Sequence, residues 1–157
     1  MRIRALAAAD RAWAEPYLDE EWGGALHVRR GELVDILAPP GLVAEEAGRR
    51  LGLATFRRDG GECELAFIAA FERHRGVGTA LLDEVRRAAA GCERIWVVTT
   101  NDNLDALRFY QRRGFRLAVL RPGAVDEART LRKPTIGHVG EFGIPIRDEL
   151  ELRLEEA

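Results

Sequence analysis

Residues 71–82, FERHRGVGTALL, contain two glycines, Gly76 and Gly78, between a basic cluster and the start of an apolar helical pattern. A glycine loop that leads from a strand into a helix can bind an anion. The first N–H groups of the helix have no internal acceptor, and they lie at the positive end of its dipole. Glycine also lets the backbone approach a phosphate closely. The segment therefore predicts a phosphate-binding loop.

Two nucleotide-binding motifs fit this loop poorly. A nucleoside-triphosphate loop has a lysine before its Ser or Thr, whereas Gly78 is followed directly by Thr79. A dinucleotide-binding loop requires a small residue where Leu81 stands, although Asp102 lies at roughly the separation expected of the acidic residue that binds ribose. Both motifs are therefore disfavoured.

A second group of residues suited to chemistry lies downstream. Asn103, Ala106 and Tyr110 are spaced i, i+3 and i+7, so on a helix all three share one face. Two arginines and a glycine at 112–114 then provide the cations and the glycine that commonly end a helix. The spacing predicts that one helical face presents all three side chains.

Regular elements must position both groups. Apolar residues at 77, 81, 85 and 88 predict a helix over 77–90, directly after the glycine loop. The run IWVVT at 95–99 predicts a strand buried on both faces. The other predicted elements are a helix over 8–18, a helix capped by Asn101 or Asp102, and strands over 42–46, 51–57, 62–69, 115–120 and 143–152.

The connections between these elements indicate the fold class. Residues 47–50, AGRR, predict a tight hairpin turn and antiparallel pairing, whereas residues 27–37 fit a helix and a strand equally well. The order strands, helix, strand, helix, strands predicts an α/β domain of the α+β kind with a mixed sheet. Because the chain has 157 residues, 46% of them hydrophobic, we expect a single domain over residues 1–157.

Charge and composition argue against several partners. The formal net charge is −2 and the pI is about 6.0, which gives no overall basic field, so we expect no nucleic-acid partner. The N-terminal residues MRIRALAAADRAWAEP lack the apolar core of a signal peptide. No segment reaches the roughly 20 apolar residues of a membrane span. We therefore expect a cytoplasmic protein with no membrane partner.

The residue types also argue against metal and serine chemistry. His27, His74 and His138 are scattered, and Cys63 and Cys92 lack a metal-ligand spacing, so we expect no metal. The chain contains no serine, which excludes a Ser-His-Asp mechanism. The cysteines are expected to be reduced and to pack as small hydrophobic residues.

Both groups resemble motifs of the GNAT superfamily of N-acetyltransferases. Residues 73–78, RHRGVG, match the Arg/Gln-x-x-Gly-x-Gly/Ala signature of that superfamily. Residues 103–115, NLDALRFYQRRGF, resemble its second motif, Asn-x-x-Ala-x-x-x-Tyr followed by Gly-Phe. Trp22-Gly23, the segment 99–103 (TTNDN) and the ending 143–152 (GIPIRDELEL) are similar to a bacterial subgroup, so the resemblance covers nearly the full chain.

The resemblance implies a mostly antiparallel mixed sheet flanked by helices, with a splayed strand before the glycine loop. It also implies acetyl-CoA as the donor. The pyrophosphate of this donor is expected to bind the backbone amides of five consecutive residues, namely Arg75, Gly76, Val77, Gly78 and Thr79. The guanidinium groups of Arg73 and Arg75 are expected to add positive charge.

The remaining donor contacts follow from the same resemblance. The pantetheine arm is expected to lie beside the splayed end of the strand and to pair with the backbone near Ile68 and Ala70. The amide of Asn103 would bond this arm, and the small Ala106 would let it approach. Attack by an amine on a thioester expels a thiolate, whose thiol has a pKa near 8.5, and Tyr110 is the expected proton donor.

The attacking amine must also lose a proton, because an alkyl ammonium has a pKa near 10.4. Glu64 is the expected base, since it lies on the strand where histone-type GNAT enzymes carry a catalytic glutamate. Glu62, Glu21, His27 and a water molecule are the alternatives. The oxyanion is expected to accept a hydrogen bond from a strand amide within 68–70.

These residues predict an enzyme that transfers acetyl from acetyl-CoA to a primary amine by direct attack in a ternary complex. One alternative is a module of the same fold that holds acyl-CoA without turnover, as a sensor or partner subunit. Another is a nucleotide-binding regulator. The acidic residues at 19–21 and at Glu149 and Glu151 favour a cationic acceptor.

Two expectations concern the C-terminal half. The exposed edge of the last strand suggests a homodimer formed through that strand. Residues 127–141, rich in Arg, Pro and Gly, fit a lip over the acceptor site and an ordinary solvated loop equally well.

Overall fold

The computed structural model describes residues 1–72 and 75–155. These residues form two compact units, the first comprising residues 1–25 and 35–95 and the second residues 26–34 and 96–155. The single domain expected over 1–157 stays a prediction. In the described part of the chain, no helix is both long enough and apolar enough to cross a membrane.

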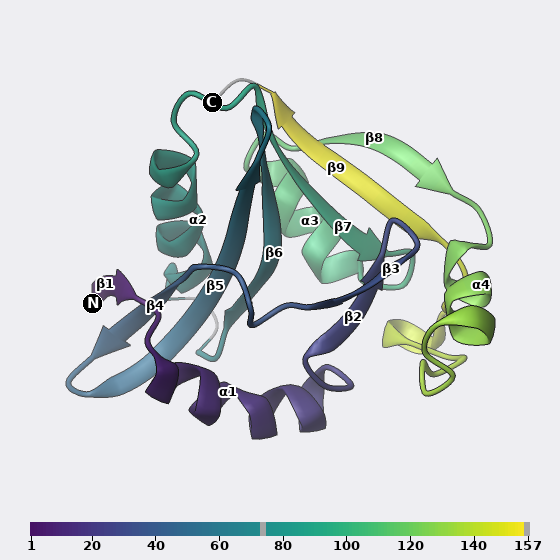
Figure 1. Ribbon diagram of the computed structural model, residues 1–157, viewed down its shortest axis with the longest axis horizontal. Coiled ribbons are helices and arrows are strands. Elements are labelled where there is room, and N and C mark those ends of the chain that lie inside the picture. Colours follow the sequence, from purple (N-terminus) through teal and green to yellow (C-terminus); the bar gives the residue numbers. More distant parts are fainter. Residues whose placement is uncertain (73–74, 156–157) are drawn as a thin grey trace. The chain divides into compact units, whose positions relative to one another are not determined.

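The first unit is built on antiparallel strands in the order β1-β4-β5-β6. The strands are β1 (Arg2–Ala5), β4 (Gly41–Glu46), β5 (Arg49–Asp59) and β6 (Glu62–Ala70), and the helices are α1 (Ala8–Glu21) and α2 (Val77–Ala88). Helix α2 lies along β4, β5 and β6 (Figure 1). The predicted hairpin is confirmed, and Ala47 and Gly48 in its turn have φ angles of 50° and 78°, the positive values that a type I′ turn requires.

Helix α2 has the amphipathic character that its sequence predicts. Its buried residues are Val77, Leu81, Leu82 and Val85. They pack on the strands, and the close approach depends on Gly52 of β5. A Cβ atom at Gly52 would lie 2.6 Å from Val77 Cγ1 and 2.7 Å from a backbone carbonyl oxygen of β6. The first turn of α2 is thus fixed against the middle of the sheet.

Asp10 anchors the start of α1. Its carboxylate accepts hydrogen bonds from the Ala7 N–H (2.7 Å), from Arg4 (2.7 and 2.9 Å) and from Arg50 Nε (2.8 Å). Asp10 is 1% exposed, and the hydrogen bonds from Arg4 hold its pKa well below the usual range. This buried carboxylate ties the helix to β1 and β5.

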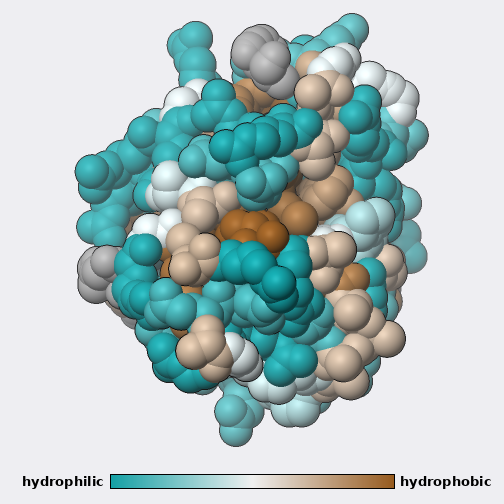
Figure 2. All heavy atoms as spheres, turned by 90° about the vertical axis from the view of Figure 1, so that its left-hand side faces the viewer, coloured by the Kyte–Doolittle hydropathy of each residue, from teal (hydrophilic) through white to brown (hydrophobic). Residues whose placement is uncertain are grey.

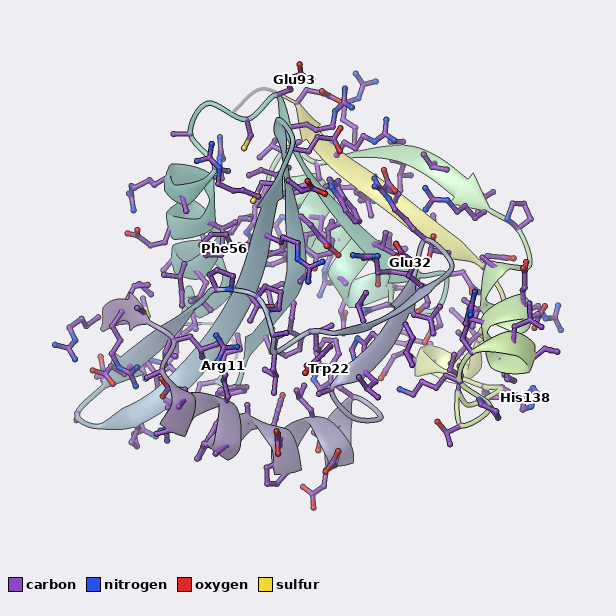
Figure 3. The ribbon with its side chains drawn as sticks, in the orientation of Figure 1. Arg11, Trp22, Glu32, Phe56, Glu93 and His138 are labelled. Carbon is purple, nitrogen blue, oxygen red and sulfur yellow. The ribbon has the colours of Figure 1, made fainter. Side chains whose placement is uncertain are left out.

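Two side chains labelled in Figure 3 attach α1 to the rest of the first unit. Arg11 donates from Nη2 to the carbonyl oxygen of Pro39 (3.1 Å). Trp22, which follows the last residue of α1, packs edge-on against Phe67 of β6 with ring centroids 5.0 Å apart.

The face of this unit seen in Figure 2 is mostly hydrophilic, with apolar residues in a central hollow.

The second unit contains the strand order β7-β9-β8 and a separate hairpin of β2 and β3. Its strands are β2 (Leu26–Arg29), β3 (Glu32–Asp35), β7 (Arg94–Thr100), β8 (Arg116–Arg121) and β9 (Glu149–Glu155); β3 and β7 each share residues with the first unit. Its helices are α3 (Leu104–Arg112), α4 (Ala124–Leu131) and a short 3₁₀ turn (Glu141–Gly143). The predicted α/β class with a mostly antiparallel sheet is confirmed (Figure 1).

The ambiguous segment 27–37 forms the β2–β3 hairpin and not a helix. Its turn residues Arg30 and Gly31 have φ angles of 51° and 76°, so both adopt the left-handed conformation of a type I′ turn. An arginine in this conformation is unusual, and contacts of Arg30 described below hold it there.

The strand predicted over 143–152 begins later, at Glu149. Pro145 has no N–H to donate to a ladder. The N–H groups of Arg147 and Asp148 donate to the side-chain oxygen of Asn101 (2.9 and 3.0 Å). Among the described residues, the segment makes only an isolated antiparallel bridge, between Pro145 and Val139, so this part of the predicted strand is a loop.

Helix α4 is missing from the sequence prediction. It covers residues 127–131 of the segment 127–141, so that part is a helix and not a loop. A lip over the acceptor site stays a prediction. Gly123 caps it in a left-handed conformation (φ 72°) and donates its N–H to Asp148 Oδ1 (2.8 Å). Val125 and Ala128 are buried. The acidic first turn was the available signal for this helix.

The expected exposed edge on the C-terminal strand is also wrong. Strand β9 lies between β7 and β8 and has a strand on each side. Strand β8 is its antiparallel partner and exposes Leu117 (55%) and Leu120 (60%). A homodimer stays a prediction, but the C-terminal strand does not provide a free edge for it.

Candidate active site

The glycine loop leads from β6 into α2, as the sequence predicts. Gly76 is the N-cap residue of α2 and has φ 73° and ψ 15°, a left-handed conformation that glycine adopts without steric cost. The first helical hydrogen bond runs from the Ala80 N–H to the Gly76 carbonyl (3.0 Å). Residues 77–79 therefore form the first turn, where a helix has no internal acceptors for its amides. Such an arrangement can bind an anion.

Of the two arginines predicted to add positive charge at the phosphate site, Arg75 lies within the described residues. Its guanidinium donates to Glu46 (Nη2···Oε2, 2.6 Å) and to Glu72 (Nη1···Oε2, 3.0 Å). Glu72 also accepts from Arg49 (2.6 Å). The positive charge expected to serve a phosphate is thus paired with two carboxylates. Arg73, the other predicted cation, lies outside the described residues.

The backbone of β6 is oriented as the predicted donor contacts require. The Phe71 N–H donates to the Leu51 carbonyl (2.7 Å), and Ile68 and Ala70 are opposite Ala54 and Gly52 of β5. Hydrogen-bonded and non-hydrogen-bonded pairs alternate along an antiparallel ladder. The N–H and C=O groups of residues 68 and 70 therefore point away from β5.

Glu64 is buried in β6. Its neighbours Cys63 and Leu65 are also buried, and its side chain is 6% exposed. A carboxylate at this depth requires compensating interactions. Buried ionisable groups are common in functional sites. Two positions further along β6, Ala66 has no partner on β5, because the register shifts between Thr55 and Phe56 and leaves Ala66 as the extra residue of a bulge. The pairing is thus irregular beside the proposed base.

The alternative bases lie in different surroundings. Glu62 forms an ion pair with Arg94 (2.8 Å). Glu21 is exposed at the last residue of α1. His27 is half-buried in β2, within the second unit.

Three consecutive residues, Asn101, Asp102 and Asn103, connect β7 to α3, and each side chain binds a different backbone segment. Asn101 bonds the loop at 145–148, as described above, and Asp102 accepts from the Glu141 N–H (3.0 Å). Asn103 caps α3 by accepting from the Ala106 N–H (3.3 Å), and its Nδ2 donates to Thr99 (3.1 Å). The cap is therefore Asn103 and not Asn101 or Asp102.

The face of α3 predicted from the spacing is present. Asn103 lies at its N-cap, Ala106 is half-buried, and Tyr110 is 6% exposed. The Tyr110 ring packs against Phe109 and Phe115, with centroids 5.5 and 5.4 Å away. Burial raises the pKa of Tyr110 well above its ordinary value. The phenol therefore carries its proton throughout the neutral and mildly alkaline range.

Glu149 and Glu151 do not form the acidic acceptor surface expected from the sequence. Glu151 is 0% exposed and accepts from Arg30 (2.8 and 2.9 Å), Arg121 (2.9 Å) and Arg153 (2.9 Å). Glu149 accepts from the Arg30 N–H (3.1 Å) and from Arg121 Nη1 (2.5 Å). Burial by itself raises the pKa of Glu151, but these arginines lower it to about 2. Internal arginines neutralise both carboxylates, so they give no support for a cationic acceptor.

Several side-chain contacts were not predicted from the sequence. Glu46 and Glu72 pair with Arg75, and the Arg30 guanidinium lies 3.5 Å from the Trp96 ring centroid. The predicted hairpin, which places Glu46 beside a turn, was the only sequence signal that could have indicated the pairing of Glu46 with Arg75. Within 1–72 and 75–155, no group of three or more His, Cys, Asp or Glu side chains could hold a metal ion.

Solved structures share this arrangement of strands and helices. An acetyltransferase from Bacillus subtilis in complex with CoA matches with a TM-score of 0.69 and 18% identity, over 99% of both chains. A GNAT family acetyltransferase from Elizabethkingia anophelis with acetyl-CoA bound matches with a TM-score of 0.69 and 20% identity, over 99% of this chain and 97% of that one. At these identities the likeness establishes a shared fold.

The sequence itself establishes the family. The profile of the acetyltransferase (GNAT) family matches residues 7–115, and the chain belongs to this family. Its sequence is 46% identical to that of the uncharacterized protein YdhI of Bacillus subtilis (strain 168). The 107 aligned residues make up 67% of this chain. The chain spans 66% of the length of YdhI, slightly less than two thirds.

Proposed function

We propose that this chain is an N-acetyltransferase that transfers the acetyl group of acetyl-CoA to a primary amine by direct attack in a ternary complex. The observation that carries the proposal is the left-handed Gly76 at the start of α2, in a chain of the acetyltransferase (GNAT) family. Two proteins of the same fold that have CoA or acetyl-CoA bound support this choice of donor.

In this proposal the donor is bound mainly by backbone groups. The pyrophosphate accepts hydrogen bonds from the amides of residues 75–79, with charge from Arg73 and Arg75. The pantetheine arm pairs with the β6 groups at 68 and 70 that point away from β5, and it contacts the face of α3 that carries Asn103 and Ala106.

The chemical step exchanges one bond to the acetyl carbon for another. The neutral amine nitrogen attacks the thioester carbonyl carbon, and the carbonyl oxygen becomes an oxyanion that accepts from a β6 amide within 68–70. When the intermediate collapses, the C–N bond remains, the C–S bond breaks, and the electron pair leaves with sulfur. The products are an acetamide and CoA.

Three proton transfers complete the balance. Glu64 accepts the proton that the ammonium form of the acceptor must lose, directly or through water. Tyr110 gives its proton to the departing thiolate, and it recovers, directly or through water, the second proton that the attacking nitrogen loses as the acetamide forms. Its raised pKa keeps this proton in place, whereas a thiol pKa near 8.5 means that the leaving group needs only modest assistance.

The test combines binding with turnover. Thermal unfolding is measured with CoA, acetyl-CoA, NAD and ATP, and a panel of primary amines is incubated with acetyl-CoA while released thiol and acetylated product are quantified. Stabilisation by CoA and acetyl-CoA together with an acetylated amine supports the proposal. Stabilisation without product from any amine supports a non-catalytic acyl-CoA sensor. Stabilisation by NAD or ATP alone contradicts both.

A further inference from the structure

An ion-pair network joins the glycine loop to the β4–β5 turn. We call it the Arg75 network; it consists of Arg75, Glu46, Glu72, Arg49 and the amino group of Met1. Arg75 bridges Glu46 (2.6 Å) and Glu72 (3.0 Å). Glu46 also accepts from the Met1 amino group (3.3 Å), and Glu72 also accepts from Arg49 (2.6 Å). The two carboxylates therefore hold the guanidinium that immediately precedes Gly76.

This pairing is easily exchanged. The side chains of Arg75, Glu46 and Glu72 are 39%, 38% and 33% exposed, and ion pairs in such surroundings contribute little to stability. Hydrogen bonds from Arg75 lower the pKa of both carboxylates, so both are ionised near neutral pH. The network holds Arg75 without burying it.

A phosphate at the start of α2 would compete for the same guanidinium. Arginine forms paired hydrogen bonds with phosphate as readily as with carboxylate. An anion bound by the amides of 77–79 would also be repelled by the charges of Glu46 and Glu72, which lie beside the same loop. Both effects oppose anion binding.

We propose that Glu46 and Glu72 are positioning residues that compete with the donor phosphates for Arg75 and thereby weaken the affinity for CoA. The inference rests on the proposed function, because it takes CoA as the ligand of the loop. Product CoA carries the same phosphates as acetyl-CoA, so the competition also hastens its release after transfer.

Calorimetric titration of the full chain at low ionic strength tests this role. We expect Glu46→Gln and Glu72→Gln each to bind CoA about 3- to 10-fold more tightly than the wild type, an advantage that shrinks towards 1 M salt. Pantetheine, which has the thiol arm without the phosphates, should bind all these variants equally. Glu84→Gln removes a carboxylate from the exposed Arg87–Glu84 pair on α2 and is the matched control, with unchanged affinity.

A double-mutant cycle separates this role from a structural one. Arg75→Gln should weaken CoA binding, and in that background Glu46→Gln should lose the part of its effect that comes from competition for Arg75 and keep the part that comes from direct repulsion of the anion. Thermal unfolding of each variant verifies that it is folded. Unchanged or weaker CoA binding by both single variants overturns the inference, and so does an equal gain for pantetheine. A wild type that does not bind CoA overturns the proposed function and the inference together, whereas wild-type binding with unresponsive variants overturns the inference alone.

Discussion

Tyr110 shows how burial determines what a single side chain can do. Its phenol lies among aromatic rings and is 6% exposed, and burial raises its pKa above the ordinary value of 10.0. Burial disfavours the charged phenolate, so the group stays protonated until the pH exceeds that raised value. A proton is therefore present at every pH at which an amine acetyltransferase would work.

Replacing Tyr110 with Phe tests its role as the acid. We expect kcat to fall about 10- to 100-fold, because the thiolate loses its proton donor, while the Kd for acetyl-CoA changes little. Steady-state kinetics and calorimetry give the two quantities. Tyr17→Phe removes the hydroxyl from the other tyrosine of the chain and should leave kcat unchanged. Full activity of Tyr110→Phe would show that another group, or water, supplies the proton.

Asn103 has a structural role that the motif does not reveal. Its side-chain oxygen caps α3, so Asn103→Ala should lower the free energy of unfolding by about 1 kcal/mol. Asn103→Asp keeps an oxygen at the cap and should retain most of that stability, while it loses the Nδ2 donor. Urea unfolding of the two variants separates the roles. Equal stability of the Ala and Asp variants would argue against the cap.

At the scale of elements, the position of the phosphate loop depends on how closely α2 approaches β5. Gly52→Ala would place a methyl group 2.6 Å from Val77, so we expect a loss of about 1–3 kcal/mol and weaker CoA binding as the first turn shifts. Gly137→Ala is the control, because its nearest neighbour would be 3.8 Å away. Chemical denaturation and CoA titration measure both effects. A Gly52→Ala variant as stable as the wild type would contradict the close packing.

The β2–β3 hairpin, β8 and β9 are joined through one carboxylate. Removing the charge in Glu151→Gln leaves Arg30 and Arg153 without their carboxylate partner at a buried position, and we expect a loss of about 3–5 kcal/mol. The exposed pair gives the comparison, since Glu84→Gln should change stability by less than about 0.5 kcal/mol. Urea unfolding measures the stability of both variants. Equal free energies of unfolding for Glu151→Gln and Glu84→Gln would mean that the Glu151 ion pairs make no net contribution to stability.

At the scale of the whole molecule, the same buried carboxylates predict sensitivity to acid. The pKa of Glu151 is lowered from 4.5 to about 2, and that of Asp10 is also lowered. A lowered pKa in the folded state means that the stabilisation is complete above the unfolded-state pKa and is lost as the pH falls from about 4.5 towards 2. For Glu151 this amounts to about 3 kcal/mol.

Unfolding measured between pH 7 and pH 2 checks this prediction. Wild-type stability should decline steeply below about pH 4.5, and Glu151→Gln should decline less, because it has already lost that contribution. Parallel curves for the two proteins would contradict the assignment of the acid sensitivity to Glu151.

Local patterns predicted much of this fold, and long-range contacts account for much of what was missed; α4, which has a local signal in its acidic first turn, is the exception. The glycine loop, the periodicity of α2 and the β4–β5 hairpin are signals within a dozen residues. Arg30 and Glu151 are 121 positions apart, so the neutralisation of an apparent acidic surface has no local signature. The late start of β9 likewise depends on the Asn101 side chain binding backbone more than 40 positions away. In the Arg75 network, the pair of Arg75 with Glu46 spans 29 positions and has the same long-range character.

In the proposed donor site, the amides at the start of α2 bind the phosphates of acetyl-CoA, and amide hydrogen exchange reports on each of these amides. Exchange is measured with and without saturating acetyl-CoA. We expect slower exchange at residues 75–79, because each amide that donates to a phosphate is protected, with little change in α4. Binding of acetyl-CoA without any protection at 75–79 would contradict the account.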